Sequence, residues 1–475
     1  MLKLPNVLVI MSDDQGAWAM GCAGNPDICT PNHDRLATEG TRFDHFFCTS
    51  PVCSPARASF LTGRTPSDHG VHDWIRKGNV DDAEDVMKRG VDRPIEYLEG
   101  LDGFTDHLAK AGYNCGFSGK WHLGASGIPQ KGNDWWYAYA LGGGNYYDYY
   151  RFDNSPEADH KTQYMTDYYT DRALEFIDDN AGSEEPFCLS LHYTAPHTPL
   201  GRDQHSAEMF ALYDDCTFYD MPRDAPHPWH GWNPTEEERC ETLRGYFAAI
   251  SAMDGNIGRV LEKLDALGIR ENTLVIFLSD NGFSVGHHGI FGKGNGTYPM
   301  NMYEESVKIP FIVSMPGTVP ASVVHSGMWS QYDWMPTILD FLGIDNPESK
   351  ALPGSSFAHV LRGEDDPGRE RVVVFDEYGP VRMIRTREWK YVHRYPDGPH
   401  ELYNLVDDPK EYINLMDDPE SCADTVTILR GDLEEWFKKY SNPERDGSKL
   451  PVTGSGQYDM SDRVDDTVTA FAQLT

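Results

Sequence analysis

The sequence predicts a large α/β domain built on a mixed, mostly parallel sheet, followed by a smaller α+β domain with an antiparallel sheet. Over the first 370 residues, short apolar segments alternate with helical patterns, which is typical of a sheet flanked by helices. After that point the segments alternate apolar with polar residues between turns, which is typical of antiparallel strands. We therefore expect one domain over residues 1–370 and a second over residues 371–475.

The strands of the large domain are expected where short apolar runs end at polar residues. These runs are Asn6–Met11, Asn114–Gly119, Phe187–His192, Thr273–Ser279 and Pro310–Met315. Their apolar character on both faces indicates strands that helices cover on both sides.

Helices are expected between these strands. Thr30 can cap a helix that begins at Pro31, because serine, threonine and proline favour these first positions. Glu236–Leu267 predicts a long helical region with one possible break, and Asp333–Leu342 predicts a shorter helix. The Gly- and Tyr-rich stretch 142–169 is interpreted as an ordered loop insertion.

The C-terminal domain is expected to contain four strands and one helix. The strands correspond to the segments VVVFDEYG, VRMIRT, WKYVHRY and HELYNL, and the helix lies near Thr425–Tyr440. The polar stretch from Ser441 onward is expected to wrap around the surface.

The composition excludes several classes of protein. With 41 Lys+Arg against 75 Asp+Glu, the net charge is −34, which argues against general nucleic-acid binding and polybasic membrane docking. No apolar run is long enough to span a membrane, and the N-terminus does not resemble a signal peptide, so we expect a cytoplasmic protein. Nine cysteines without a CxxC pair indicate reduced thiols and no zinc site.

Acidic and amide side chains follow two of the expected strands. Asp13 and Asp14 come after the first strand, and Asp280 and Asn281 come after Thr273–Ser279. In α/β sheets the ligand site lies at the carboxyl ends of the strands, so these side chains can converge. Oxygen-only ligands suit a hard divalent cation, which predicts one Ca²⁺ ion, with Mg²⁺ as the alternative.

Cys53 lies at the start of a short helix. Pro55 and Gly63 bracket this helix, and Arg57 lies one turn after the cysteine. A helix N-terminus and a nearby guanidinium both favour an anion, so an activated thiolate is one interpretation. An inert core thiol is the other.

The string CSPARASFLTGR around Cys53 resembles the signature of the formylglycine-dependent sulfatases of the alkaline phosphatase superfamily. Further motifs follow the family order: NVLVIMSDDQG, GKWHLG, APHTP, SDNG and HGIFGK. The C-terminal segment RMIRTREWKYVHRY also resembles the small domain of this family, so the resemblance covers nearly the whole chain. It is closest in character to bacterial carbohydrate sulfatases, and it implies the alkaline-phosphatase-like fold.

The resemblance also implies a metal site and a nucleophile. A maturation enzyme would oxidise Cys53 to formylglycine, whose hydrated aldehyde attacks sulfur. That residue would share the metal with the two strand-end pairs already described. Arg57 would orient the hydrated aldehyde.

The remaining catalytic roles fall on lysines and histidines. By position in the family motifs, Lys120 and Lys293 would hold sulfate oxygens. His122 would contact the formylglycine hydroxyl, and His197 would protonate the leaving alcohol.

The substrate is expected to be a small sulfated carbohydrate, from which the enzyme removes one sulfate in an exo-acting manner, with glycosaminoglycan fragments among the candidates. Trp74 and Arg76 lie in the segment after the signature helix, where an aromatic ring can stack on a sugar. His288 matches a family histidine, although His287 replaces the usual glutamate before it, and Arg382 could pair with a substrate carboxylate. Phosphonate or phosphate monoester hydrolysis, and choline or aryl sulfate hydrolysis, are the alternatives.

Overall fold

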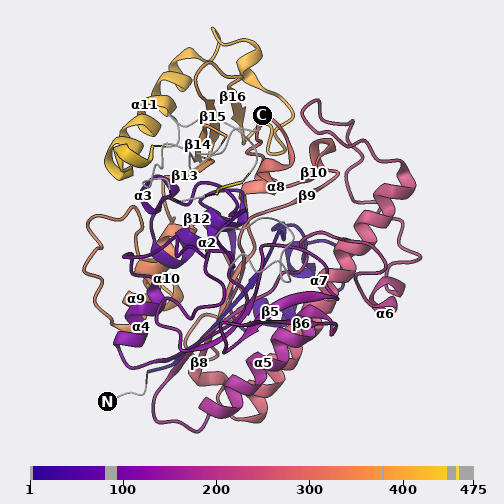
Figure 1. Cartoon of the computed structure of the whole chain (residues 1–475). Coiled ribbons are helices and arrows are strands. Elements are labelled where there is room, and N and C mark those ends of the chain that lie inside the picture. The colour runs from indigo at the N-terminus through magenta and orange to yellow at the C-terminus, as the bar shows by residue number, and fades with distance from the viewer. Residues whose placement is uncertain (1–3, 81–93, 377–378, 447–455, 459, 461–475) are drawn as a thin grey trace.

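The computed structural model describes residues 4–80, 94–376, 379–446, 456–458 and 460. Two sheets dominate it, a large one with ten strands and a smaller one with four (Figure 1). The order of the large sheet is β12-β2-β11-β8-β1-β7-β3-β4-β5-β6.

The centre of the large sheet is parallel. Strand β1 (Asn6–Ser12) lies between β7 (Phe187–His192) and β8 (Thr273–Ser279), and β3 (Asn114–Lys120) pairs with β7 and with β4 (Trp135–Tyr139). All these pairings are parallel. The polar residues that follow these strands therefore reach the same edge of the sheet.

Antiparallel pairings complete both sides of the sheet. Strand β11 (Phe311–Ser314) runs antiparallel to β8 and to β2 (Thr41–Phe47), while β12 (Val323–Ser330) is parallel to β2. The far edge consists of β5 (Tyr149–Asp153) and β6 (Ala158–Lys161). The stretch expected as a loop insertion therefore contributes the last two strands on this side of the sheet, and Tyr149 and Phe152 of β5 are buried against it.

The side chains of β1 alternate between two apolar cores. Val7, Val9 and Met11 pack into one core, and Leu8 and Ile10 pack into the other. Because a strand points successive side chains to opposite faces, helices must cover both sides of the sheet.

Two sets of helices provide this cover (Figure 1). One face carries α1 (Pro31–Thr38), α5 (Met165–Asn180) and α7 (Glu236–Ala266), and the other carries α2 (Cys53–Thr62), α4 (Phe104–Lys110), α9 (Trp334–Leu342) and α10 (Ala358–Leu361). Helix α7 is continuous over 31 residues, so the break allowed for at the sequence level is absent. Short elements complete the large domain: α3 (Pro66–His69), α6 (Ala207–Ala211), β9 (Ser284–Val285), β10 (Phe291–Gly292) and α8 (Glu304–Val307).

The small sheet is antiparallel throughout. Its strands are β13 (Arg371–Asp376), β14 (Val381–Thr386), β15 (Trp389–Arg394) and β16 (Glu401–Asn404), paired in chain order. Helix α11 (Ala423–Tyr440) packs on it through Leu429, Leu433 and Phe437. The predicted fold class, a mixed, mostly parallel sheet with helices plus an antiparallel C-terminal sheet, is confirmed.

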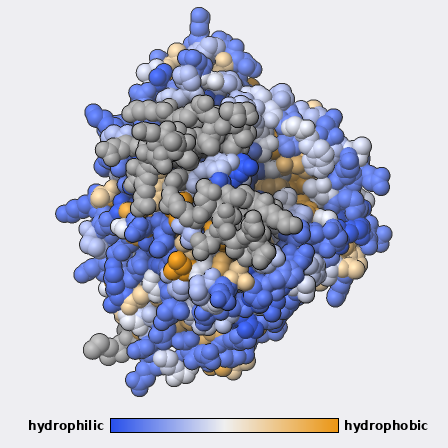
Figure 2. Space-filling view, viewed as in Figure 1, coloured by the Kyte–Doolittle hydropathy of each residue, from blue (hydrophilic) through white to orange (hydrophobic). Residues whose placement is uncertain are grey.

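The face shown in Figure 2 is mostly hydrophilic, as the net charge of −34 leads one to expect. Among the described residues, every helix is too short or too polar to cross a membrane. All nine cysteines are free thiols. Most of the tail from Ser441 lies outside the described residues, but Gly456 and Gln457 are buried within the molecule and do not follow its surface.

Candidate active site

The acidic residues predicted at the strand ends do converge. Strands β1 and β8 are hydrogen-bonded beyond their last residues, since the Asp280 amide donates to the Ser12 carbonyl at 3.1 Å. On the other side of β1, the Asp13 amide donates to the Ala195 carbonyl at 3.0 Å. These backbone bonds hold the segments after β1, β7 and β8 together at one edge of the sheet.

Three carboxylates at this edge are buried. Asp13, Asp14 and Asp280 are at most 2% exposed. Oδ1 of Asp280 accepts a hydrogen bond from the Asp14 amide at 3.2 Å, and the Asn281 side-chain amide donates to Asp14 Oδ1 at 2.8 Å. The four residues from the two strand ends therefore form one polar cluster.

Basic side chains neutralise this cluster. Lys120, the last residue of β3, pairs with Asp13, and Lys293 Nζ lies 2.6 Å from Asp14 Oδ1. Burial alone would raise the pKa of Asp13 and of Asp14, but these two lysines hold both pKa values below the ordinary value. Both carboxylates are therefore ionised at neutral pH.

The cluster fits a divalent cation. Asp13 Oδ1 and Asn281 Oδ1 are buried and have no hydrogen-bond partner, which is costly unless another group satisfies them. Ca²⁺ and Mg²⁺ both bind carboxylate and amide oxygens. The residues present would therefore accommodate a hard cation between the two strand ends.

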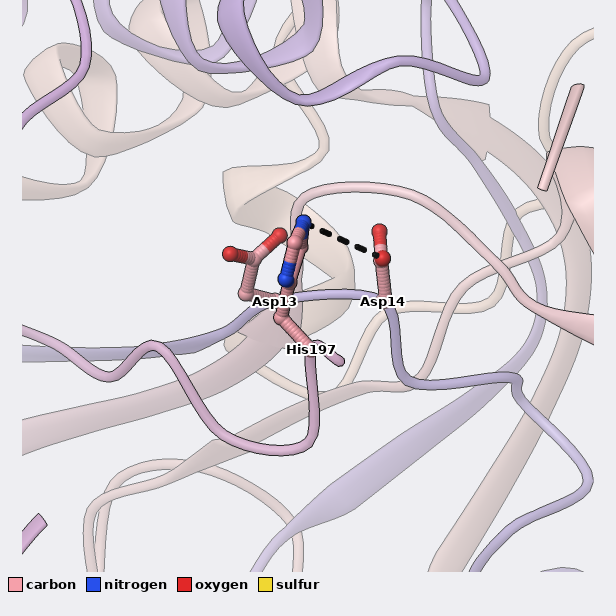
Figure 3. Close-up of side chains that lie close together, drawn as sticks. All are labelled: Asp13, Asp14 and His197. Atoms are coloured by element: carbon pink, nitrogen blue, oxygen red, sulfur yellow. Dashed lines mark ion pairs between the residues drawn. The ribbon is translucent and has the colours of Figure 1, made fainter. Parts of the chain in front are cut away.

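Figure 3 shows how His197 joins the acidic pair. Ligand atoms of Asp13, Asp14 and His197 all lie within 4.8 Å of one another, and His197 Nε2 is 3.8 Å from Asp14 Oδ2. The other ring nitrogen, Nδ1, lies 2.7 Å from the Thr198 carbonyl oxygen and so carries the hydrogen. Nε2 is thereby left to face the site.

Cys53 is the first residue of helix α2, as its spacing from Gly63 predicts. Gly63 ends the helix in the left-handed conformation with φ of 66°. The thiol is buried, and this burial raises the pKa of Cys53 although Lys120 and Lys293 act to lower it. The interpretation as an activated thiolate is therefore not supported, and an unmodified Cys53 would be a poor nucleophile at neutral pH.

His122 faces the cysteine with its unprotonated nitrogen. Its Nε2 lies 2.9 Å from the Ile75 carbonyl, which can only accept, so the hydrogen is on Nε2. Nδ1 then points its lone pair at Cys53 Sγ, 3.3 Å away. Burial, followed by the charge of Lys120, holds the pKa of His122 well below its usual range, so the ring is neutral.

Arg57 lies beneath the cysteine, in the next turn of α2. Its Nε donates to Asp280 Oδ2 at 2.8 Å, and its Nη1 donates to the Lys120 carbonyl at 2.8 Å. Nη2 is buried and has no hydrogen-bond partner. The guanidinium therefore fixes the base of the site and keeps one donor for a group at position 53.

A cavity of about 890 Å³ opens above these residues, a size usual for small-molecule sites. Cys53, His122, His197 and Lys293 line this cavity, and all of them except His197 are buried at its inner end. Trp74 and Arg76, for which substrate contacts are predicted, line the same cavity. Other lining residues were not singled out from the sequence: Lys77, Asn79, Leu141, Phe283 and Phe291.

Two residues predicted to bind substrate lie elsewhere. His288 stacks on Tyr303 at 3.8 Å between ring centroids and faces a separate cavity beside Glu305. Arg382 pairs with Asp446 and lies 3.6 Å above the ring of Phe437. Neither lines the cavity at Cys53, so a direct substrate contact is not supported for them.

Gly142 and Gly143 were not predicted from the sequence as part of the site, but they lie in close contact with the rings of His122 and His197. A Cβ on Gly142 would lie 2.1 Å from the His122 ring, and one on Gly143 would lie 2.7 Å from the His197 ring. The run of three glycines at 142–144 was the available signal, but only the structure shows what packs against it.

The site combines three features: residues for a hard cation, a position for a modified nucleophile, and two lysines that can bind an anion. This combination is typical of a hydrolase that cleaves charged esters. The Sulfatase family model matches residues 5–344, and a model described as N-sulphoglucosamine sulphohydrolase, C-terminal, matches residues 286–439. The chain therefore belongs to the sulfatase family. It is a sulfuric ester hydrolase.

Individual proteins resemble this chain over most of its length. An N-acetylglucosamine-6-O-sulfatase of Bacteroides thetaiotaomicron is 28% identical and aligns with 94% of this chain and 88% of its own. A choline-sulfatase of Rhizobium meliloti is 27% identical over 84% of this chain and 80% of its own. A solved structure of a protein with its substrate D-glucosamine-2-N,6-O-disulfate has a TM-score of 0.78 and 26% identity, and covers 94% of this chain and 100% of that one.

Replacing Gly142 by Ala should reduce turnover by about 10- to 100-fold, because the new methyl group must displace the His122 ring from Cys53. The measurement is the kcat of the folded protein on an aryl sulfate. The matched control is Gly182→Ala, where an added Cβ meets nothing within 4 Å. Equal kcat values for the two variants would show that Gly142 does not set the position of His122.

Removing the metal should abolish activity and lower the unfolding temperature, because Asp13 and Asn281 lose the partner for their buried oxygens. The protein is unfolded with a chelator, refolded and assayed, and Ca²⁺ or Mg²⁺ is then added back. Chelator already saturated with Ca²⁺ is the control. Full activity in protein shown by elemental analysis to be metal-free would rule out this site.

Proposed function

We propose that this enzyme removes a sulfate ester from the end of a small sulfated saccharide, and that formylglycine made from Cys53 is its nucleophile. The observation that carries the proposal is the position of Cys53, at the start of α2, 3.3 Å from a neutral His122 and at the inner end of the cavity. A hydrated aldehyde at position 53 would supply one hydroxyl to attack sulfur and a second to expel sulfate. A thiol with a raised pKa supplies neither.

The lysines would hold the sulfate group. Lys120 and Lys293 each lie beside an aspartate of the cluster; Lys120 is the last residue of β3, and Lys293 directly follows β10. Negative charge spreads over the non-bridging oxygens as the ester bond breaks, and cations already in place stabilise it without reorganisation. A Ca²⁺ ion held by Asp13, Asp14, Asp280 and Asn281 would add Lewis acidity at the same oxygens.

His122 and His197 would each carry out one of the two proton transfers of the reaction. His122 Nδ1 faces position 53, so it can accept a proton from a hydroxyl there. His197 also lines the cavity, with Nε2 near Asp14, and a hydrogen carried on Nε2 would pass to the leaving alcohol. An alkoxide is a poor leaving group, so its release needs an acid at this position.

The substrate class follows from the cavity and the relatives. Cys53 is 3% exposed at the inner end of the cavity, so a sulfate can reach it from a chain end more easily than from the middle of a polymer. Trp74 offers an aromatic face and Arg76 a cation for an anionic sugar. The relatives named for sulfated glucosamine support a sugar substrate, and choline sulfate is the main competitor.

Replacing His197 by Ala should lower kcat/KM for a sulfated sugar by about 100-fold or more, and for an aryl sulfate far less. The reason is that a phenolate leaves without protonation, whereas a sugar alkoxide does not. His160→Ala, on the exposed strand β6, is the control. Equal losses on both substrates would remove the acid role, and faster turnover of choline sulfate or of a phosphonate monoester than of any sulfated sugar would reject the proposed substrate class.

A further inference from the structure

The loop of residues 70–77 holds His122 in place. The Ile75 carbonyl accepts the His122 Nε2 hydrogen at 2.9 Å, and this bond determines which ring nitrogen faces Cys53. The same loop contributes Trp74, Arg76 and Lys77 to the cavity wall. The position of this loop therefore determines both the orientation of the His122 ring and the shape of the cavity wall.

A short C-terminal segment pairs with this loop. Gln457 forms a parallel β-bridge with Ile75. Its amide donates to the Trp74 carbonyl at 2.8 Å, and its carbonyl accepts from the Arg76 amide at 2.9 Å. These two bonds lie on either side of Ile75 and fix the direction of the Ile75 carbonyl.

The side chain of Gln457 holds the first half of the loop. Nε2 donates to the Gly70 carbonyl at 2.9 Å, and Oε1 accepts from the His72 amide at 2.8 Å. The residue is fully buried. A buried amide with both ends hydrogen-bonded to backbone restrains the loop strongly, because any movement leaves polar groups unsatisfied.

The residues beside Gln457 fit the same surface. Gly456 has a φ of +84°, and a Cβ there would lie 2.8 Å from the Trp74 ring, so only glycine allows this approach. The Tyr458 ring lies under Arg76 and Lys77, at 5.2 Å and 5.5 Å from their charged groups. Three consecutive tail residues thus contact the segment that carries the cavity wall.

We propose that Gln457 is a positioning residue of the active site, which acts through the Ile75 carbonyl to keep His122 Nδ1 directed at residue 53. Gln457 itself does not line the cavity at Cys53. Residues 456–458 thus support the catalytic site through this loop. This inference rests on the proposed role of His122.

The test replaces Gln457 in the full-length enzyme. Gln457→Ala should lower kcat on an aryl sulfate by about 10-fold or more and change KM by less than about threefold, since proton transfer loses its alignment while the sulfate-binding lysines remain. Gln457→Met keeps the side-chain length but neither side-chain hydrogen bond, so it should show a similar loss. Gln163→Ala, an exposed glutamine, is the control.

Two further measurements separate positioning from stability. The mass of the peptide that contains residue 53 must show equal modification in all variants, and the unfolding temperature must show that each is folded at the assay temperature. In a His122→Ala background, adding Gln457→Ala should leave the residual kcat unchanged, because the residue through which Gln457 acts is gone.

The outcomes are distinct. A wild-type kcat for folded Gln457→Ala, or a full additional loss in the His122→Ala background, would overturn the inference and leave the proposed function intact. A wild-type kcat for His122→Ala itself would contradict the proposed role of His122, and the inference would fail with it. If Gln457→Ala does not fold, Gln457→Met in both backgrounds decides in the same way, because methionine keeps the side-chain length but forms neither hydrogen bond.

Discussion

The balance of buried charge at the carboxyl edge of β1 and β8 is the constraint on which the site depends. Asp13, Asp280 and Lys120 are fully buried, and an unpaired ion in such a place costs several kcal/mol. Each carboxylate therefore needs a cation at a fixed position, which requires β3 to end at Lys120 and α2 to place Arg57 beside Asp280. The arrangement that satisfies the carboxylates is also the one that we propose binds the sulfate group.

The same charge balance explains why an unmodified thiol is unsuited to position 53. Lys120 and Lys293 act to lower the pKa of Cys53, but burial and the neighbouring aspartates outweigh them. The lysines are largely neutralised by their aspartates, so they do not produce a thiolate. His122 is held neutral, with its lone pair towards residue 53, which suits the acceptance of a proton from a hydroxyl group.

The local sequence predicted which residues gather at the strand ends. Features of the site that depend on long-range contacts could not be predicted from it. The strands β7 and β8 and the residues after β1 and β8 were predictable, because apolar runs and their polar ends are local signals. His288 and Arg382 lie outside the cavity at Cys53, because their contacts with Tyr303, Glu305 and Asp446 depend on tertiary packing. The contacts of Gln457 join residues almost 400 positions apart in the sequence, so no local sequence pattern could predict them.

The most direct test of the nucleophile is the mass of the tryptic peptide Phe43–Arg57, from enzyme produced together with a formylglycine-generating system. Fragmentation separates Cys48 from Cys53 within this peptide. An aldehyde located at residue 53, in the active fraction of the enzyme, is the predicted result. An active enzyme that carries only an unmodified thiol at residue 53, made in cells that convert a control sulfatase, would contradict it.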